Sequence, residues 1–91
     1  MTPLEEKVYK KIVETMDVDV STLKDFDETT PLFGEAKEGK PSMGLDSIDS
    51  LELVVMIEKE WGLGEIASED MTKLTTVKAI ADYIITHGGA A

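Results

Sequence analysis

The stretch from Ser47 to Trp61 constrains the fold most, because its apolar residues fall on two sides of one helix. At about 3.6 residues per turn, one stripe contains Ile48, Leu51, Glu52 and Val55. The other stripe contains Leu53, Val54, Ile57 and Trp61. A single core covers only one face of a helix. We therefore expect the second stripe to face the core and the first to lie partly in solvent, although periodicity alone equally allows both stripes to be buried.

Capping residues predict where this helix and its neighbours begin and end. Asp46 precedes the helix as N-cap, Asp49 follows three residues later, and Gly62 supplies a stop. A first helix is predicted over residues 3–16, where apolar residues recur every three or four positions. A last helix is predicted to begin at residue 75 or 76 and to end at the Gly-Gly pair near the C-terminus.

The rest of the chain predicts one short helix and a long first loop. Ser68 can cap a short helix over residues 68–71. Residues 17–40 are rich in Asp, Thr, Pro and Gly, and the part over residues 34–41 reads as a mobile, solvated loop. Four apolar side chains are expected to pin the long loop to the core: Leu23, Phe26, Leu32 and Phe33. The sequence therefore predicts an all-α bundle of three main helices and one short helix, without strands.

Size and composition indicate a single domain over residues 1–91. The chain is 42% hydrophobic, which suffices for one core but not, we expect, for a deep cleft. The predicted core contains Leu4, Val8, Ile12, Leu53, Ile57, Trp61, Leu74, Val77, Ala81 and Ile84. The longest purely apolar run, Leu53 to Ile57, is far too short to span a membrane, and the first residues lack the basic and apolar regions of a leader. We expect a cytoplasmic monomer.

Charge and residue types exclude several classes of function. The chain has 19 acidic and 9 basic residues, and its formal charge of -10 disfavours nucleic acid and anionic membranes as partners. It favours partner proteins that carry basic patches. With one histidine and no cysteine, no set of base, nucleophile and oxyanion donor can be assembled, so we expect no enzyme. Any thiol chemistry must come from an attached group.

A primary hydroxyl at the start of the second predicted helix is the candidate functional group. Ser47 follows the Asp46 cap, so its hydroxyl should be exposed near the positive end of the helix dipole, a favourable place for a phosphate. Ser50, one turn along, is expected to be an ordinary helical serine. The apolar stripe that begins at Ile48 is rimmed by Asp46, Asp49, Glu52 and Glu58. A small apolar stripe with a charged rim suits a transient protein interface.

The acidic residues of the first loop offer a competing interpretation. Six residues match the ligand positions of an EF-hand calcium loop: Asp17, Asp19, Ser21, Leu23, Asp25 and Glu28. Thr22 stands where such a loop requires glycine, and Pro31 follows where a helix should begin. We therefore expect no metal site. His87, near the end of the last helix, is expected to be solvated and without a catalytic role.

The run from Gly44 to Val54, GLDSIDSLELV, resembles the modification site of the acyl carrier protein family, which shares a Gly-x-Asp-Ser-Leu-Asp pattern and an acidic second helix. The likeness extends to residues 4–8, 73–77 and 82–84. Ser47 falls on the family's modified serine. The resemblance implies a four-helix bundle that receives 4'-phosphopantetheine from coenzyme A on Ser47. It would carry acyl groups as thioesters on the thiol of this arm.

The same resemblance implies a set of partner enzymes. Asp46 would help a phosphopantetheinyl transferase to place the serine. An acyl-loading enzyme, a ketosynthase and other acyl-processing enzymes would meet the exposed side of the second helix through basic patches. The residues expected there are Ile48, Leu51, Glu52 and Val55, with Asp49 and Glu58 on the acidic rim.

Three departures from the family pattern leave the pathway open. Ser42-Met43 precedes Gly44 where typical fatty-acid carriers have Asp-Leu, the loop over residues 34–43 is lengthened, and Ile48 replaces the usual leucine. The acyl groups could belong to fatty-acid, polyketide or specialised lipid synthesis. A peptidyl or aryl carrier of nonribosomal peptide type is an alternative. An acidic helical adaptor that is never modified is another.

Overall fold

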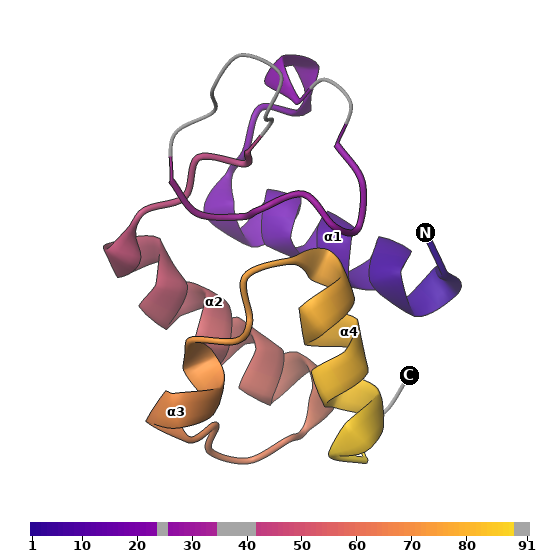
Figure 1. Ribbon diagram of the computed structural model, residues 1–91, viewed down its shortest axis with the longest axis vertical. Coiled ribbons are helices and arrows are strands. Elements are labelled where there is room, and N and C mark those ends of the chain that lie inside the picture. Colours follow the sequence, from indigo (N-terminus) through magenta and orange to yellow (C-terminus); the bar gives the residue numbers. More distant parts are fainter. Residues whose placement is uncertain (24–25, 35–41, 89–91) are drawn as a thin grey trace.

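The computed structural model describes residues 1–23, 26–34 and 42–88 (Figure 1). Within these ranges the regular secondary structure is helical, without a strand. The elements are α1 (Pro3–Met16), the 3-10 helix η1 (Val20–Thr22), α2 (Ser47–Trp61), α3 (Ser68–Met71) and α4 (Val77–Thr86). Three long helices and one short helix confirm the predicted all-α bundle. The sequence analysis does not predict η1, which Asp19 caps through the Ser21 amide.

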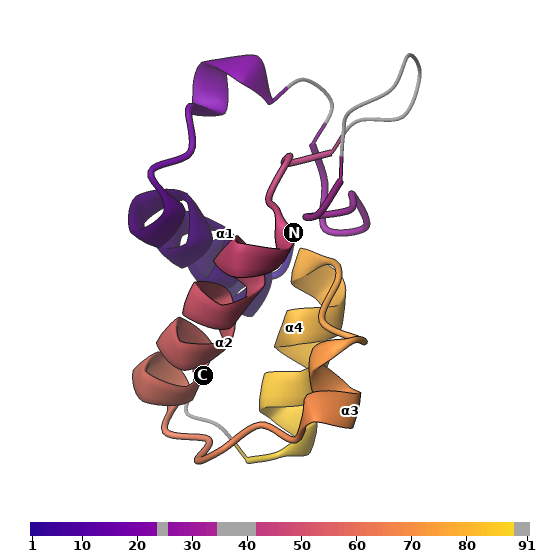
Figure 2. The same ribbon diagram turned by 90° about the vertical axis from the view of Figure 1, so that its left-hand side faces the viewer.

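The helices form a small bundle around α1. This helix contacts both α2 and α4, while α3 lies beside α4 on the side away from α1 (Figures 1 and 2). Each long helix presents an apolar side to its neighbours, which is what holds helices of this length together in water. In this arrangement the N-terminal end of α2 lies near the long first loop, and α3 lies near α4.

The start of α1 is fixed by a Thr2 cap and by a reciprocal bond. The Thr2 hydroxyl accepts a hydrogen bond from the Glu5 amide at 3.1 Å, and a Glu5 carboxylate oxygen accepts one from the Thr2 amide at 2.7 Å. Together these bonds form a capping box, with Pro3 in the first turn. The helix ends at Met16, as predicted, and Asp17 takes a left-handed conformation with φ of 52°.

The other helix ends agree with the sequence prediction to within two residues, and the cap of α3 differs. Gly62 ends α2 in a left-handed conformation with φ of 63°, and the Thr76 hydroxyl caps α4 by accepting a bond from the Ala79 amide at 3.0 Å. Ser68 is wrong as the cap of α3. It is the first helical residue, and Ala67 stands at the N-cap position without a side-chain bond.

The core contains all ten residues predicted for it. Six further buried apolar residues join them: Leu32, Met43, Leu45, Val54, Ile66 and Ile80. The four residues expected to pin the first loop also reach the core, with Leu32 fully buried and Leu23, Phe26 and Phe33 packed against the cluster. The second stripe of α2 is therefore internal, and Trp61 anchors its C-terminal end with 6% of its surface exposed.

The end of the first loop is bonded to two distant segments. Leu32 donates its amide to the Thr75 carbonyl at 2.9 Å, just before α4. On its other side, the Leu45 amide donates to the Leu32 carbonyl at 2.9 Å and the Gly34 amide donates to the Leu45 carbonyl at 3.1 Å. These bonds form an isolated parallel bridge between Phe33 and Leu45. The predicted lengthening of the loop falls mainly on residues 35–41, which lie outside the described residues.

Candidate functional site

Ser47 is the first residue of α2, and the residues around it form a rigid helix start. One Asp46 carboxylate oxygen accepts hydrogen bonds from the amides of Ile48 and Asp49, both at 3.0 Å. In return, the Asp49 carboxylate accepts a bond from the Asp46 amide at 3.0 Å. This is the predicted capping box, with Asp in the place of Glu. It fixes the backbone on both sides of the exposed Ser47 side chain.

The two serines near this helix start differ in what their hydroxyls do. Ser50 donates its hydroxyl to the Ser47 carbonyl at 2.6 Å, so it is engaged with the backbone of its own helix. In the described part of the chain, no hydrogen bond involves the Ser47 hydroxyl. Ser47 also lies at the positive end of the α2 dipole, which stabilises a nearby negative charge by about 0.3–1 kcal/mol. The site therefore fits a phosphate ester on Ser47 better than one on Ser50.

Replacing Asp46 with alanine is expected to lower the free energy of unfolding by about 1 kcal/mol, because the two amides at the start of α2 lose their acceptor. Urea denaturation monitored by circular dichroism would measure this. Asp46→Asn is the matched control, since asparagine caps helices about as well as aspartate. Equal stability of the alanine variant and the parent would show that the cap contributes nothing.

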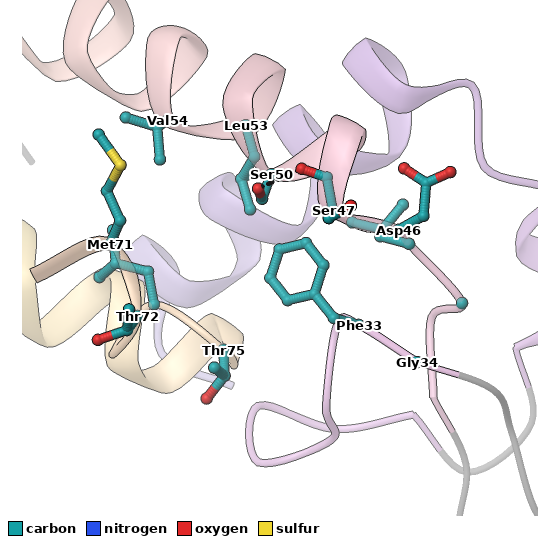
Figure 3. Close-up of a pocket in the computed structure, with 13 residues that line it drawn as sticks. Phe33, Gly34, Asp46, Ser47, Ser50, Leu53, Val54, Met71, Thr72 and Thr75 are labelled. Carbon is teal, nitrogen blue, oxygen red and sulfur yellow. Dashed lines mark hydrogen bonds between the residues drawn. The ribbon is translucent and has the colours of Figure 1, made fainter. Parts of the chain in front are cut away.

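A cavity of about 620 Å³ opens beside Ser47 (Figure 3). Its lining comes from the first loop, the start of α2, and the α3 region: Phe33, Gly34, Gly44, Leu45, Asp46, Ser47, Ser50, Leu53, Val54, Met71, Thr72, Leu74 and Thr75. The sequence analysis does not predict this cavity, which is partly open to solvent. The helices do not close against one another here, because the four-residue α3 fills only part of the space beside α2.

Each wall of the cavity belongs to a different segment. Leu53 and Val54 project from α2, Met71 and Thr72 come from the end of α3, and the Phe33 ring comes from the first loop (Figure 3). The bridge to Leu45 fixes the backbone of Phe33. Most of these side chains are apolar, so the cavity favours an apolar ligand. The sequence analysis predicts none of them as a ligand-contacting residue.

The predicted partner side of α2 is apolar and exposed. Ile48, Leu51 and Val55 expose 71%, 62% and 46% of their surfaces, which confirms that this stripe lies outside the core. Glu52 is exposed beside them. We call Ile48, Leu51, Glu52 and Val55 the exposed stripe.

The two acidic residues predicted at the rim of the exposed stripe have partners within the chain. Asp49 takes part in the capping box, and a Glu58 carboxylate oxygen accepts a hydrogen bond from the Ile66 amide at 2.6 Å. Both residues are half-buried. Their contact with partner proteins stays a prediction, and each carboxylate already has a structural role.

The acidic first loop contains hydrogen-bonded turns. Hydrogen bonds from Ser21 lower the pKa of Asp19, and hydrogen bonds from Thr29 lower the pKa of Asp27. Among the described residues, no group of three or more His, Asp or Glu side chains is placed to hold a metal ion. Asp25, one of the EF-hand positions, lies outside those residues.

The single histidine is far from the candidate site in sequence and contacts the end of its own helix. His87 is exposed at the C-cap of α4, and its ring stacks on Tyr83 with ring centroids 3.8 Å apart. Its Nδ1 lies 3.0 Å from the Tyr83 carbonyl oxygen. No helix in the described ranges has the length and apolar character needed to cross a membrane.

A compact helical fold with an exposed serine at a helix start, beside an apolar cavity, is typical of small carriers that hold a covalently attached group. Residues 41–84 match a family model described as a phosphopantetheine attachment site. This match is consistent with a member of the acyl carrier protein family, whose domains bind phosphopantetheine. Domains of this family attach a 4'-phosphopantetheine group, are generally not catalytic, and interact with acyl-processing enzymes.

Proposed function

We propose that the chain holds acyl intermediates as thioesters on a 4'-phosphopantetheine arm attached to Ser47, and passes them between enzymes. In this proposal residues 1–91 act as one carrier domain, a monomer in the cytoplasm. The observation that carries the proposal is the exposed Ser47 side chain at the rigid start of α2, next to an apolar cavity of about 620 Å³.

Attachment would join the Ser47 hydroxyl oxygen to a phosphorus of coenzyme A. The pyrophosphate P–O bond breaks, adenosine 3',5'-bisphosphate leaves, and the serine proton passes to a base. The lone histidine is at the end of α4, so a phosphopantetheinyl transferase has to supply that base. When bound, the arm supplies a thiol, which a chain without cysteine lacks.

The cavity supports an acyl cargo with an apolar chain. Its volume of about 620 Å³ is within the range of ordinary small-molecule sites, about 300–1,000 Å³. Leu53, Val54 and Met71 would contact the chain, and burying each methylene gains about 0.8 kcal/mol. A charged aminoacyl group would lose hydration against this mainly apolar lining, in which Asp46 is the one charged residue. This favours fatty-acid, polyketide or specialised lipid synthesis over a nonribosomal peptide pathway.

The exposed stripe and the charge of the chain support transient docking of the partner enzymes. An acyl-loading enzyme, a ketosynthase and the transferase would contact Ile48, Leu51 and Val55 through apolar atoms. The formal charge of -10 would attract their basic patches. Such attraction speeds association at low salt, and a small apolar contact allows rapid release.

Intact-protein mass spectrometry tests this function. Incubation with coenzyme A and a broad-specificity phosphopantetheinyl transferase should add one phosphopantetheine. Subsequent acylation should add one acyl group that hydroxylamine removes, as expected of a thioester. A known carrier serves as the positive control. A folded chain that gains no mass under conditions that modify the control would favour the unmodified adaptor.

A further inference from the structure

The α3 wall of the cavity has little holding it in place. This helix has four residues, none of them buried, and its N-cap residue Ala67 makes no side-chain bond. Within it only Met71 packs, partly buried, against the core, and the buried anchors are the residues on either side, Ile66 and Leu74, which expose 1% and 3% of their surfaces. Met71 and Thr72, which line the cavity, lie between these two anchors. The position of the wall therefore depends on how firmly the anchors are fixed.

Glu58 of α2 fixes the first of these anchors. One of its carboxylate oxygens accepts a hydrogen bond from the Ile66 amide at 2.6 Å, in a partly buried setting. Its backbone carbonyl accepts bonds from the amides of Gly62 and Leu63, the latter at 3.2 Å. Glu58 thus accepts hydrogen bonds from both ends of the segment that connects α2 to α3, from Gly62 and Leu63 at its start and from Ile66 near its end.

The negative charge of Glu58 also acts on a residue of α4. Burial raises the pKa of the Tyr83 hydroxyl, and the negative charges of Asp70 and Glu58 raise it further. Tyr83 belongs to α4, so the charge of Glu58 acts on α4 as well as on the connection between α2 and α3. A carboxylate that accepts an amide bond makes a charge-assisted hydrogen bond, which is stronger than a neutral one.

We propose that Glu58 is a positioning residue for the cargo cavity: its bond to the Ile66 amide holds the α3 wall against α2 and thereby sets how well an attached acyl chain is sheltered. The inference rests on the proposed carrier function. Glu58 does not touch the reacting atoms and acts only through the wall. Loss of the bond frees the Ile66 amide and lets Met71 and Thr72 move away from Leu53, so the chain spends more time in solvent.

The test compares thioester lifetimes on the full chain. The holo-protein is loaded with either an octanoyl or an acetyl group, and cleavage by hydroxylamine is followed by intact mass. In the parent, octanoyl should be cleaved more slowly than acetyl, because two carbons cannot occupy the cavity from the end of the arm. Glu58→Ala should speed the cleavage of octanoyl about tenfold or more, on the scale of one lost hydrogen bond to a charged group, and leave acetyl unchanged.

Three variants separate the reach of the side chain from its charge and from general destabilisation. Glu58→Gln keeps an acceptor at the same distance and should resemble the parent. Glu58→Asp keeps the charge but is one methylene shorter, so it should resemble the alanine variant. Glu60→Ala removes an equal charge from the same helix, where Glu60 pairs with Lys11 at 3.5 Å, and should leave both lifetimes unchanged. If Glu58→Ala does not fold, the aspartate and glutamine variants decide the question.

The outcomes distinguish failure of the positioning role from failure of the carrier function. Failure of the parent to accept phosphopantetheine and an acyl group would overturn the carrier function. Equal lifetimes of octanoyl and acetyl on the loaded parent would mean that the cavity shelters no chain, which overturns the positioning role alone. Slower octanoyl cleavage on the parent, with no change in Glu58→Ala or Glu58→Asp, would overturn the positioning role alone. Faster cleavage of both acyl groups would indicate general loosening and would also overturn it. Hydrogen exchange of the Ile66 amide should rise in Glu58→Ala in the unloaded protein as well.

Discussion

Ser47→Ala is expected to abolish attachment of 4'-phosphopantetheine, whereas Ser50→Ala should be modified as fully as the parent. Alanine at position 47 removes the hydroxyl oxygen that would form the phosphodiester. Ser50 cannot take its place without leaving the Ser47 carbonyl, to which it donates at 2.6 Å. Intact mass after incubation with coenzyme A and a transferase would show one added group on the parent and on Ser50→Ala, and none on Ser47→Ala.

Folding is the necessary control for this pair of variants. Ser47 is exposed, and its replacement leaves the Asp46 cap in place, so the stability should change by no more than about 0.5 kcal/mol. A thermal melt of each variant would verify this. A folded Ser47→Ala protein that still gains phosphopantetheine would move the attachment to another hydroxyl, and Ser50→Ala would then show whether Ser50 carries it.

The helix boundaries could be predicted from the sequence because each depends on neighbouring residues. The caps at Thr2, Asp46 and Thr76 act on amides within three positions, and Gly62 needs only its own backbone freedom. The range of α3 agrees with the prediction, but Ser68 is its first residue and not its cap, because serine suits both positions.

The inward side of α2 was also predictable, because burial follows the helical period. Leu53, Ile57 and Trp61 share one face, and all three are buried. The cavity could not be predicted in this way. It arises where the first loop, α2 and α3 fail to meet, and it depends on the bonds that link Leu32 to Thr75 and to Leu45. Periodicity within one segment carries no information on such a gap between segments.

The contact of Glu58 is a second example of an interaction between segments that the sequence of one segment does not predict. Its position in α2 agrees with the acidic rim of the exposed stripe, and the sequence analysis places it there. Its carboxylate meets the Ile66 amide because Gly62 turns the chain back, and that turn brings two residues eight positions apart into contact. A charged residue near a helix end can thus serve the bundle and its surface, and only the structure shows the internal partner.

Ile57→Ala is expected to lower the free energy of unfolding by about 3–4 kcal/mol, within the range of about 2–5 kcal/mol for truncating a buried isoleucine. Ile57 has no exposed surface and lies between α2 and its neighbours in the core. Ile48→Ala is the matched control, because it makes the same change in the same helix at a residue that exposes 71% of its surface. Its stability should change by about 0.5 kcal/mol or less. Urea denaturation of both variants would measure the difference.

The variants Ile57→Ala and Ile48→Ala also test whether the two sides of α2 have different functions. A small domain has about 5–15 kcal/mol of stability, so Ile57→Ala removes a large fraction of it and should lower the yield of folded protein. Ile48→Ala should fold like the parent and still bind the transferase more weakly, since it loses an apolar contact of the exposed stripe. Equal destabilisation by the two variants would contradict the division into an inner and an outer stripe. Unchanged transferase binding by Ile48→Ala would remove this residue from the docking surface.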